Sequence, residues 1–423
     1  MSAASRGRPR RAPRRPGPLA PILLAAFAAI GSTAAGQAPL AVSGSNGGWL
    51  SLWEDRGSAL VPRGAAPAFA GGVDAELRAE TSFSAETDFG AGEGFGGEPG
   101  TLSRAAFEGA LSIDAAGGAV SFAARELWAE WRPIEAIALR VGRQRLGFGS
   151  GLAWNPSNDL DPPRYATDLN APRIGSDSAL LRLEAGGLAG FPLSLSLEGF
   201  LPPAAAGTSL AKGRAAAQIY ALVGELELML AGSLSDPGGS SESWLAGGWL
   251  TFPLGPAVLG LEGGLRSRAD LYRPGAGGSP LADREAQGAV TATATLRSGD
   301  FVLMAEVNWS QGAYSREEFE AILASPWLAA YRGSILPPGS VGKWHGLARL
   351  AWAAGDLSAA LGAVADLETG AFLASADLEV QMGGRAGLAL KLAMPAGASL
   401  MGKDELGLSG RGWSCRAGVK VNY

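Results

Sequence analysis

Charged residues of both signs are concentrated between residues 126 and 177. The arginines are Arg140, Arg143, Arg145, Arg164 and Arg173, and the aspartates are Asp159, Asp161, Asp168 and Asp177. Opposed charges of this kind can set up a field across a narrow aqueous passage and so select solutes. Alternatively, the charges pair with one another and hold a surface loop in shape. The sequence alone leaves both interpretations open.

Residue combinations typical of catalysis are sparse. His345 is the only histidine and Cys415 the only cysteine, so neither a multi-histidine metal site nor an internal disulfide is possible. The glycine-rich stretch 147–151 lacks the Lys-Ser/Thr ending of a phosphate-binding loop. Acidic pairs such as Glu225 and Glu227 lie two residues apart, which is typical of a solvated strand face. We therefore expect no enzymatic activity, no metal and no cofactor.

The N-terminal 36 residues have the organisation of a secretory signal peptide. Six arginines precede an apolar stretch at 19–30, and small residues at 34–36 would allow cleavage before Gln37. Without those six arginines, 29 basic residues face 40 acidic ones, a balance that argues against nucleic-acid binding. We expect three parts: a signal peptide at 1–36, an N-terminal segment with a possible first strand at 37–71, and one domain at 72–423.

Apolar residues recur at every second position in many short segments, which is typical of β-strands with one apolar face. Clear examples are 73–79, 290–296, 301–309, 378–380 and 388–392. The 63 glycines are about twice the usual share of ~7%, which disfavours a helical protein. Beyond the signal, no apolar run approaches the ~18 residues of a spanning helix. Only helices and closed barrels satisfy their backbone in lipid, so a membrane protein with this sequence would be a barrel.

Short and long connections alternate between these segments. The long ones are at 201–213, 233–241, 270–286, 311–342, 366–369 and 396–411, and the short ones at 253–256, 297–300, 354–356 and 382–385. This alternation predicts an all-β transmembrane antiparallel up-and-down barrel of about 16–18 strands. Two connections break the rule, because 84–101 is long and 114–118 is short, and we interpret this as one misassigned strand.

The last eleven residues form the clearest amphipathic strand. Trp413 and Tyr423 lie at its ends and would sit at the two aromatic girdles of a barrel. Trp309, Trp344 and Trp352 are further candidates for the membrane interface. A terminal aromatic residue in such a strand resembles the sorting signal read by the barrel-assembly machinery. The alternative is the amphipathic edge strand of a soluble protein.

A short helix is expected within the long connection 311–342. Ser315 and Glu318 have the spacing of a capping box, while Phe319, Ile322 and Leu323 share one helical face. Pro326 would end the helix. It could narrow the mouth of a pore or simply stabilise a surface loop.

The segment from Glu126 to Arg173 resembles the outer-membrane barrels of the alginate-export and related porin-like families. It contains a strand ending in Gly142-Arg143-Gln144, then a glycine-rich turn and the Asn155-Pro156 loop. Phe148-Gly149 stands where those families usually have Trp-Gly. The resemblance implies a passive or substrate-selective channel whose loop folds toward the lumen.

These observations predict an outer-membrane porin-like channel for small hydrophilic solutes, embedded in lipid as a monomer or homotrimer. Acidic residues outnumber basic ones on the expected lumen face, with Glu262 and Glu306 among them, so we expect a weak cation preference. Two alternatives remain: a closed barrel whose surface loops bind a ligand or polysaccharide, and an outer-membrane hydrolase.

Overall fold

A computed structural model describes sixteen stretches of the chain. They are 40–55, 69–85, 101–114, 119–134, 136–145, 149–158, 175–188, 191–200, 214–235, 242–267, 272–275, 280–282, 286–327, 341–382, 386–396 and 411–422. Side chains are described from Arg125 onward for most residues in these ranges. The expected signal peptide at 1–36 lies outside the described residues.

The described chain is all-β apart from one short helix. The strands are β1 (Leu40–Asp55), β2 (Phe69–Ala85), β3 (Thr101–Asp114), β4 (Ala119–Ile134), β5 (Ile137–Gln144), β6 (Ser176–Leu188), β7 (Phe191–Phe200), β8 (Arg214–Val223), β9 (Leu226–Ser235), β10 (Ser243–Leu254), β11 (Ala257–Arg266), β12 (Tyr272–Pro274), β13 (Pro280–Ala282), β14 (Gln287–Ser298), β15 (Phe301–Ser310), β16 (Trp344–Ala354), β17 (Leu357–Asp366), β18 (Ala371–Met382), β19 (Ala386–Ala396) and β20 (Arg411–Asn422). The helix is α2 (Arg316–Leu323).

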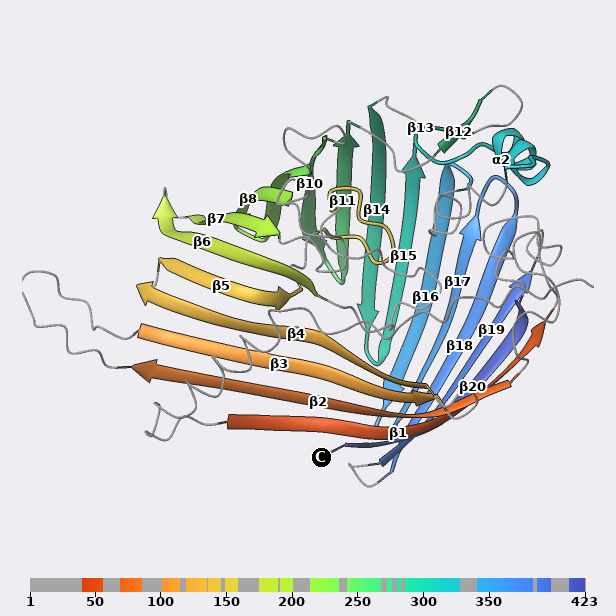
Figure 1. Ribbon diagram of the computed structural model, residues 1–423, viewed down its shortest axis with the longest axis horizontal. Helices are drawn as coiled ribbons and strands as arrows, with labels where there is room; N and C mark the ends of the chain where they lie inside the picture. Colours follow the sequence, from red (N-terminus) through yellow and green to blue (C-terminus); the bar gives the residue numbers. More distant parts are fainter. Residues whose placement is uncertain are drawn as a thin grey trace, which may run out of the picture.

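Eighteen of these strands form one antiparallel up-and-down sheet (Figure 1). Each strand pairs with the next one along the chain, while β12 and β13 form a separate hairpin between β11 and β14. The last strand also pairs with the first, from Ser45 opposite Asn422 to Asp55 opposite Arg411. Every strand of the large sheet therefore has a neighbour on both sides, and we refer to this arrangement as the ring.

Tight turns connect β10 to β11, β14 to β15 and β16 to β17 at one end of the ring, where the sequence predicted short connections. Gly224, Gly255, Gly299 and Gly355 each lie in a turn at this end with a positive φ, a conformation that favours glycine. Most of the longer connections join strands at the opposite end, which we call the loop end. The connection at 366–369, predicted to be long, is a tight turn there, and the long connection between β2 and β3 is at the turn end. The two irregular connections are not a misassigned strand, because β2, β3 and β4 pair consecutively and antiparallel, with one register shift between Glu108 and Gly109. The sequence interpretation was wrong there because connection length was taken as a strict rule.

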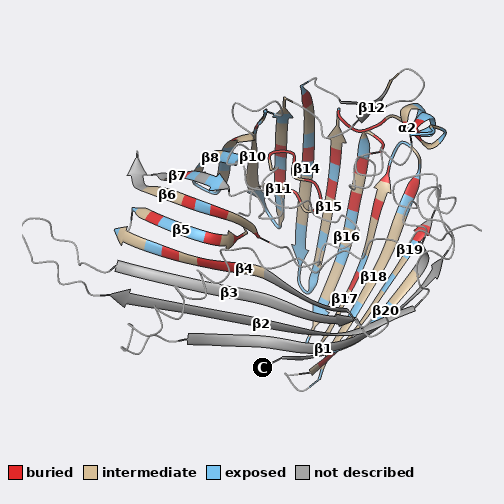
Figure 2. Ribbon diagram, in the orientation of Figure 1, coloured by how far each residue is buried: buried red, intermediate tan, exposed pale blue. Residues whose placement is uncertain are grey.

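Buried and exposed residues alternate along many strands (Figure 2), and their polarity is the reverse of that in a water-soluble sheet. Large apolar side chains such as Leu350 and Leu361 are exposed, the latter by 62%. Polar side chains that alternate with the exposed apolar ones are buried, including Glu262, Thr291 and Glu306. We call the face of the sheet that carries these polar residues the inner face, and the apolar face the outer face.

The helix α2 lies in the connection between β15 and β16, where the sequence predicted it. Ser315 caps it: the Ser315 hydroxyl accepts from the Glu318 N–H at 3.3 Å, and Glu318 accepts from the Ser315 N–H at 2.8 Å. Phe319 and Ile322 are buried on one side of the helix. Tyr314, directly before the cap, forms a parallel bridge with Val341, and both residues are fully buried. The N-terminal end of α2 is therefore attached to the end of the ring.

Candidate functional site

Residues 149–158, which follow β5, cross the inner face of the ring and lie against β11, β14 and β15 (Figure 1, yellow). We call these residues the inner segment. Two buried carboxylates of the sheet hold it. Glu262 on β11 is the first: its Oε2 accepts from the N–H groups of Ser150 at 2.6 Å and Gly151 at 3.0 Å. Its Oε1 accepts from the Ser157 N–H at 3.0 Å and the Ser157 hydroxyl at 2.7 Å.

Glu306 on β15 holds the middle of the inner segment in the same way. Its Oε1 accepts from the Trp154 N–H at 2.7 Å, and both of its oxygens accept from the Ala153 N–H at 3.2 Å. The Leu152 N–H also donates to Oε2. Glu262 and Glu306 are 0% and 1% exposed, and charge-assisted hydrogen bonds of this kind are what allows a carboxylate to be buried.

Glycines on the inner face let the backbone of the inner segment approach closely. A Cβ at Gly264 would lie 2.0 Å from the Pro156 carbonyl oxygen, and a Cβ at Gly247 would lie 2.8 Å from the Ser157 Cβ. Gly260 and Gly264 flank Glu262 at two residues on either side, so all three share one strand face. The inner face thus has little side-chain bulk around the Glu262 carboxylate, so the backbone of the inner segment can lie close to the sheet.

Aromatic and aliphatic contacts also fix the middle of the inner segment. Trp154 packs against His345 on β16, with their ring centroids 5.5 Å apart. Ala153 and Trp154 form a small buried cluster with Leu347 and Val364 of β16 and β17. His345, which is 1% exposed, also has its Nε2 within 2.8 Å of the Val341 carbonyl oxygen. The sole histidine is therefore part of the packing between the inner segment and the β15–β16 connection.

A second charged cluster lies on the inner face at β4 and β5. The Glu130 carboxylate, 4% exposed, accepts from Arg132 Nε and from Arg140 Nε, both at 2.8 Å. The Arg140 guanidinium also stacks over the Trp128 ring, 4.0 Å from its centroid. Seven strands separate β5 from β15 one way round the ring, and seven separate β4 from β16 the other way. This cluster and the inner segment therefore belong to opposite sides of the ring.

The predicted constriction residues do not all lie on one face. Arg140 is on the inner face, as described. Arg143 follows the exposed Leu139 and Val141 by strand alternation, which places it on the outer face. There it lies opposite Asp177 and donates to it at 2.9 and 2.7 Å. Beyond the end of β5, Arg145 Nε lies 3.3 Å from Glu126.

Five of the remaining predicted positions lie outside the described residues. They are Asp159, Asp161, Arg164, Asp168 and Arg173. Tyr423 is also outside them, and Trp413 is described only as a backbone position in β20.

The other three predicted interface aromatics form two levels on the outer face. Trp309 pairs directly with Trp344 across β15 and β16, and Phe301 pairs with Trp352. The Phe301 and Trp352 ring centroids are 6.4 Å apart. Eight residues separate the two levels along β15, which corresponds to about 26 Å of strand.

Glu262 and Glu306, which the sequence assigned to the lumen face, lie on the inner face and are buried there against the inner segment. Both accept hydrogen bonds from backbone N–H groups more than 100 positions away in sequence. A local signal for such an approach exists at Glu262, because glycine inside a strand often marks a closely approaching backbone. No comparable signal surrounds Glu306, whose neighbours on the inner face are Met304 and Asn308.

Neither a metal cluster nor a spanning helix is found in the described ranges. No group of three or more potential metal-binding side chains occurs among the described residues. None of the described helices is long and apolar enough to cross a membrane.

Comparisons with known proteins give structural similarity only. No protein-family model and no curated protein matches the sequence. The chain is similar to an engineered mutant of the Rh. blastica porin, with a TM-score of 0.45 and 11% identity, covering 91% of this chain and 100% of that one. It is also similar to Salmonella typhi OmpF in complex with daunomycin, with a TM-score of 0.48 and 11% identity, covering 91% of this chain and 97% of that one.

Proposed function

We propose that this chain is a porin-like channel of the outer membrane, with the ring of strands forming a transmembrane β-barrel. The observation that carries the proposal is the reversed burial of the strands. Apolar side chains cover the outer face and polar ones lie on the inner face, which suits lipid outside and water inside. With the strands tilted by about 35–45°, the two aromatic levels are roughly 20 Å apart along the barrel axis, which is most of the roughly 25 Å height of the apolar band of an outer-membrane barrel.

The inner segment is the proposed constriction of the channel. It lies on one side of the ring, and the Glu130, Arg132 and Arg140 cluster faces it from the other. Small hydrophilic solutes would pass between these two sides, where fixed charges act on them directly. Of the predicted arginines, Arg140 is retained for this role. The residues at 159–173 remain candidates on the sequence alone.

Export, assembly and oligomeric state are proposed from the sequence. Residues 1–36 would direct export, and the C-terminal strand would be recognised by the barrel-assembly machinery. The aromatic residues of the outer face would contact the lipid interface, and a homotrimer is the proposed alternative to a monomer. The resemblance to the alginate-export and related porin-like families also remains a proposal.

Planar-bilayer recording of the purified protein tests the channel. We expect stepwise KCl conductance with a weak preference for cations. A folded protein without conductance would support the alternative of a closed barrel whose loops bind a ligand. Clear anion selectivity would contradict the predicted preference.

A matched pair of variants tests the constriction. Arg140→Gln removes a cation from the inner face and should increase the cation preference, measured as the reversal potential in a KCl gradient. Arg143→Gln lies on the same strand but on the outer face, so it should leave the reversal potential unchanged. If the two substitutions changed the reversal potential equally, Arg140 would not act on ions in the passage.

A further inference from the structure

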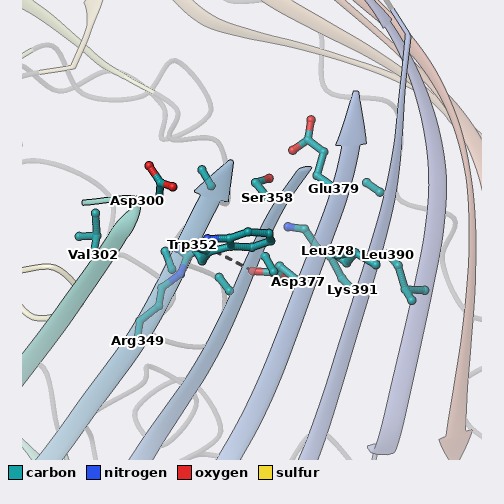
Figure 3. A pocket seen from close by; sticks show the side chains of 15 residues that line it. Asp300, Val302, Arg349, Trp352, Ser358, Asp377, Leu378, Glu379, Leu390 and Lys391 are labelled. Carbon is teal, nitrogen blue, oxygen red and sulfur yellow. Dashed lines mark ion pairs between the residues drawn. The ribbon is translucent and has the colours of Figure 1, made fainter. Parts of the chain in front are cut away.

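A hollow of about 210 Å³ lies on the sheet at the turn end of β15–β19, away from the inner segment (Figure 3). Its floor is made of small side chains from neighbouring strands, such as Ala351, Ser358 and Ala389. Its charged lining residues are Asp300, Arg349, Asp377, Glu379 and Lys391. Apart from Asp300, which lies in a turn, these charged residues alternate with exposed apolar side chains and so belong to the inner face.

The charges are sorted into two levels along the strands. At the level nearer the loop end, Arg349 Nη2 lies 3.5 Å from Asp377 Oδ2, and Lys391 is the direct cross-strand partner of Asp377. Two cations thus surround one carboxylate, and these three lining residues together carry a net positive charge. Figure 3 shows Asp377 between the Arg349 and Lys391 side chains.

The level nearer the turn end is acidic. Ser358 is paired with Glu379 on one side and with Ala353 on the other. The Ala353 N–H donates to the Asp300 carbonyl oxygen at 3.1 Å, which brings Asp300 to the same level. Asp300 and Glu379 therefore lie on the turn side of the hollow, without a cation among its lining residues at that level.

Two residues separate Asp377 from Glu379, so the levels are about 6.6 Å apart along the strand. A single small ion in the hollow would be attracted by the charges of one level and repelled by those of the other. A solute with an anionic and a cationic end can satisfy both levels if its length matches their separation. A fully extended dipeptide spans at most about 7 Å, whereas a single amino acid spans about half of that.

We propose that this hollow is a transit site for dipeptide-sized zwitterions, with the carboxylate toward Arg349 and Lys391 and the ammonium toward Glu379 and Asp300. This inference rests on the proposed channel function. The Arg349 and Asp377 side chains are 17% and 31% exposed, so water reaches both of them. Partial exposure weakens the ion pairing, which suits a site that releases its solute into the passage.

Glycylglycine is the probe, added to the channel while it conducts KCl in a planar bilayer. We expect a saturable, concentration-dependent reduction of the current. Glycine, which is too short to reach both levels, should reduce the current far less. N-acetylglycinamide has nearly the same length but no charge, and it should have no saturable effect.

Two variants and one control locate the site. Lys391→Met and Glu379→Gln should each raise the half-blocking concentration of glycylglycine by about tenfold, as expected for the loss of one charge-assisted contact. Glu225→Gln changes an exposed charge in the β8–β9 turn, outside the hollow, and should leave the block unchanged. KCl conductance of each variant reports that it is folded, and Lys391→Met is the decisive variant if Glu379→Gln does not fold.

Failure of the zwitterion site can be distinguished from failure of the proposed channel. Normal KCl current without block by glycylglycine, or with equal block by N-acetylglycinamide, overturns the zwitterion site and leaves the channel standing. Block that persists in Lys391→Met places the binding elsewhere and also overturns the site. Absence of KCl current overturns the channel and the site together.

Discussion

Glu262 and Glu306 decide where the inner segment lies. An isolated buried carboxylate is strongly destabilising, and the two side chains avoid this by accepting hydrogen bonds from five consecutive N–H groups at 150–154. The same bonds satisfy backbone donors of a segment that has no strand partner. Each carboxylate therefore stabilises the inner segment, and the inner segment in turn makes each buried charge tolerable.

Glu306→Ala removes the acceptor of three N–H groups and should release the middle of the inner segment. We expect the unfolding free energy to fall by about 2 kcal/mol or more, since buried donors are left unsatisfied. Single-channel conductance should rise because the segment no longer lies flat on β15. The control is Glu320→Ala on the exposed face of α2, where an i,i+4 pair with Arg316 contributes at most about 0.5 kcal/mol. Unchanged conductance in Glu306→Ala would contradict an anchoring role.

Gly264→Ala tests the close approach of the inner segment to β11. The added Cβ would meet backbone atoms of Pro156, which cannot rotate away, so we expect a cost of about 1–3 kcal/mol and altered conductance. Gly199→Ala is the matched control on β7, because its Cβ would meet nothing within 4 Å. Thermal unfolding in detergent measures the stability difference. Equal stability of the two variants would mean that the inner segment does not rest on Gly264.

At the scale of the strand, the reversed alternation assigns opposite environments to adjacent residues. Leu361 on β17 is 62% exposed at mid-strand, and Thr295 on β14 belongs to the inner face. Leu361→Arg should lower the unfolding free energy in phospholipid bilayers by about 2–4 kcal/mol, because a charge would be placed in lipid. Thr295→Arg places the same side chain in the lumen and should cost much less. A soluble sheet would tolerate a charged side chain on its exposed face, so equal unfolding free energies for Leu361→Arg and the unchanged protein contradict the membrane proposal.

The helix α2 is only eight residues long and has a capping box at its N-terminus. We therefore expect the cap to contribute much of its stability. Ser315→Ala removes the acceptor for the Glu318 N–H and should destabilise the helix by about 1 kcal/mol. Faster amide exchange at 316–320, with unchanged exchange in the strands, is the expected result. If exchange in α2 stays the same, packing of Phe319 and Ile322 holds the helix without the cap.

The same cap makes the helix sensitive to acid. Hydrogen bonds from the Glu317 backbone N–H and the Ser315 hydroxyl lower the pKa of Glu317. A lowered carboxyl pKa contributes stability above the ordinary pKa of a glutamate, and this contribution is lost as the pH falls through the lowered value. Exchange in α2 should therefore quicken only on the acidic side of the ordinary glutamate pKa.

At the scale of the whole molecule, pairing of β1 with β20 leaves no open edge among the described strands of the ring. Deleting 411–423 would expose the edges of β1 and β19, whose backbone groups have no partner in lipid. We expect this variant to aggregate and to lose the heat-modifiable mobility of a folded barrel in semi-native electrophoresis. Conduction by the deletion variant would show that the ring is not the functional unit.

Local patterns predicted much of this architecture. Alternating segments such as 290–296 and 301–309 became strands with the expected faces, because a period of two is a property of the strand itself. The cap at Ser315 was predictable for the same reason, since it needs only residues three positions apart. The connections at 84–101 and 114–118 were misinterpreted because connection length is not determined by strand geometry.

The sequence by itself determined the strands, their two faces, the tight turns and the capped helix, since each depends on residues near one another in the chain. Only the tertiary structure decided what the buried charges bind. Glu262 and Glu306 meet the inner segment across more than 100 positions, and the hollow near Asp377 combines five strands and a turn. The physical reason is register: which residues meet depends on strand pairing around the whole ring, which no local pattern contains.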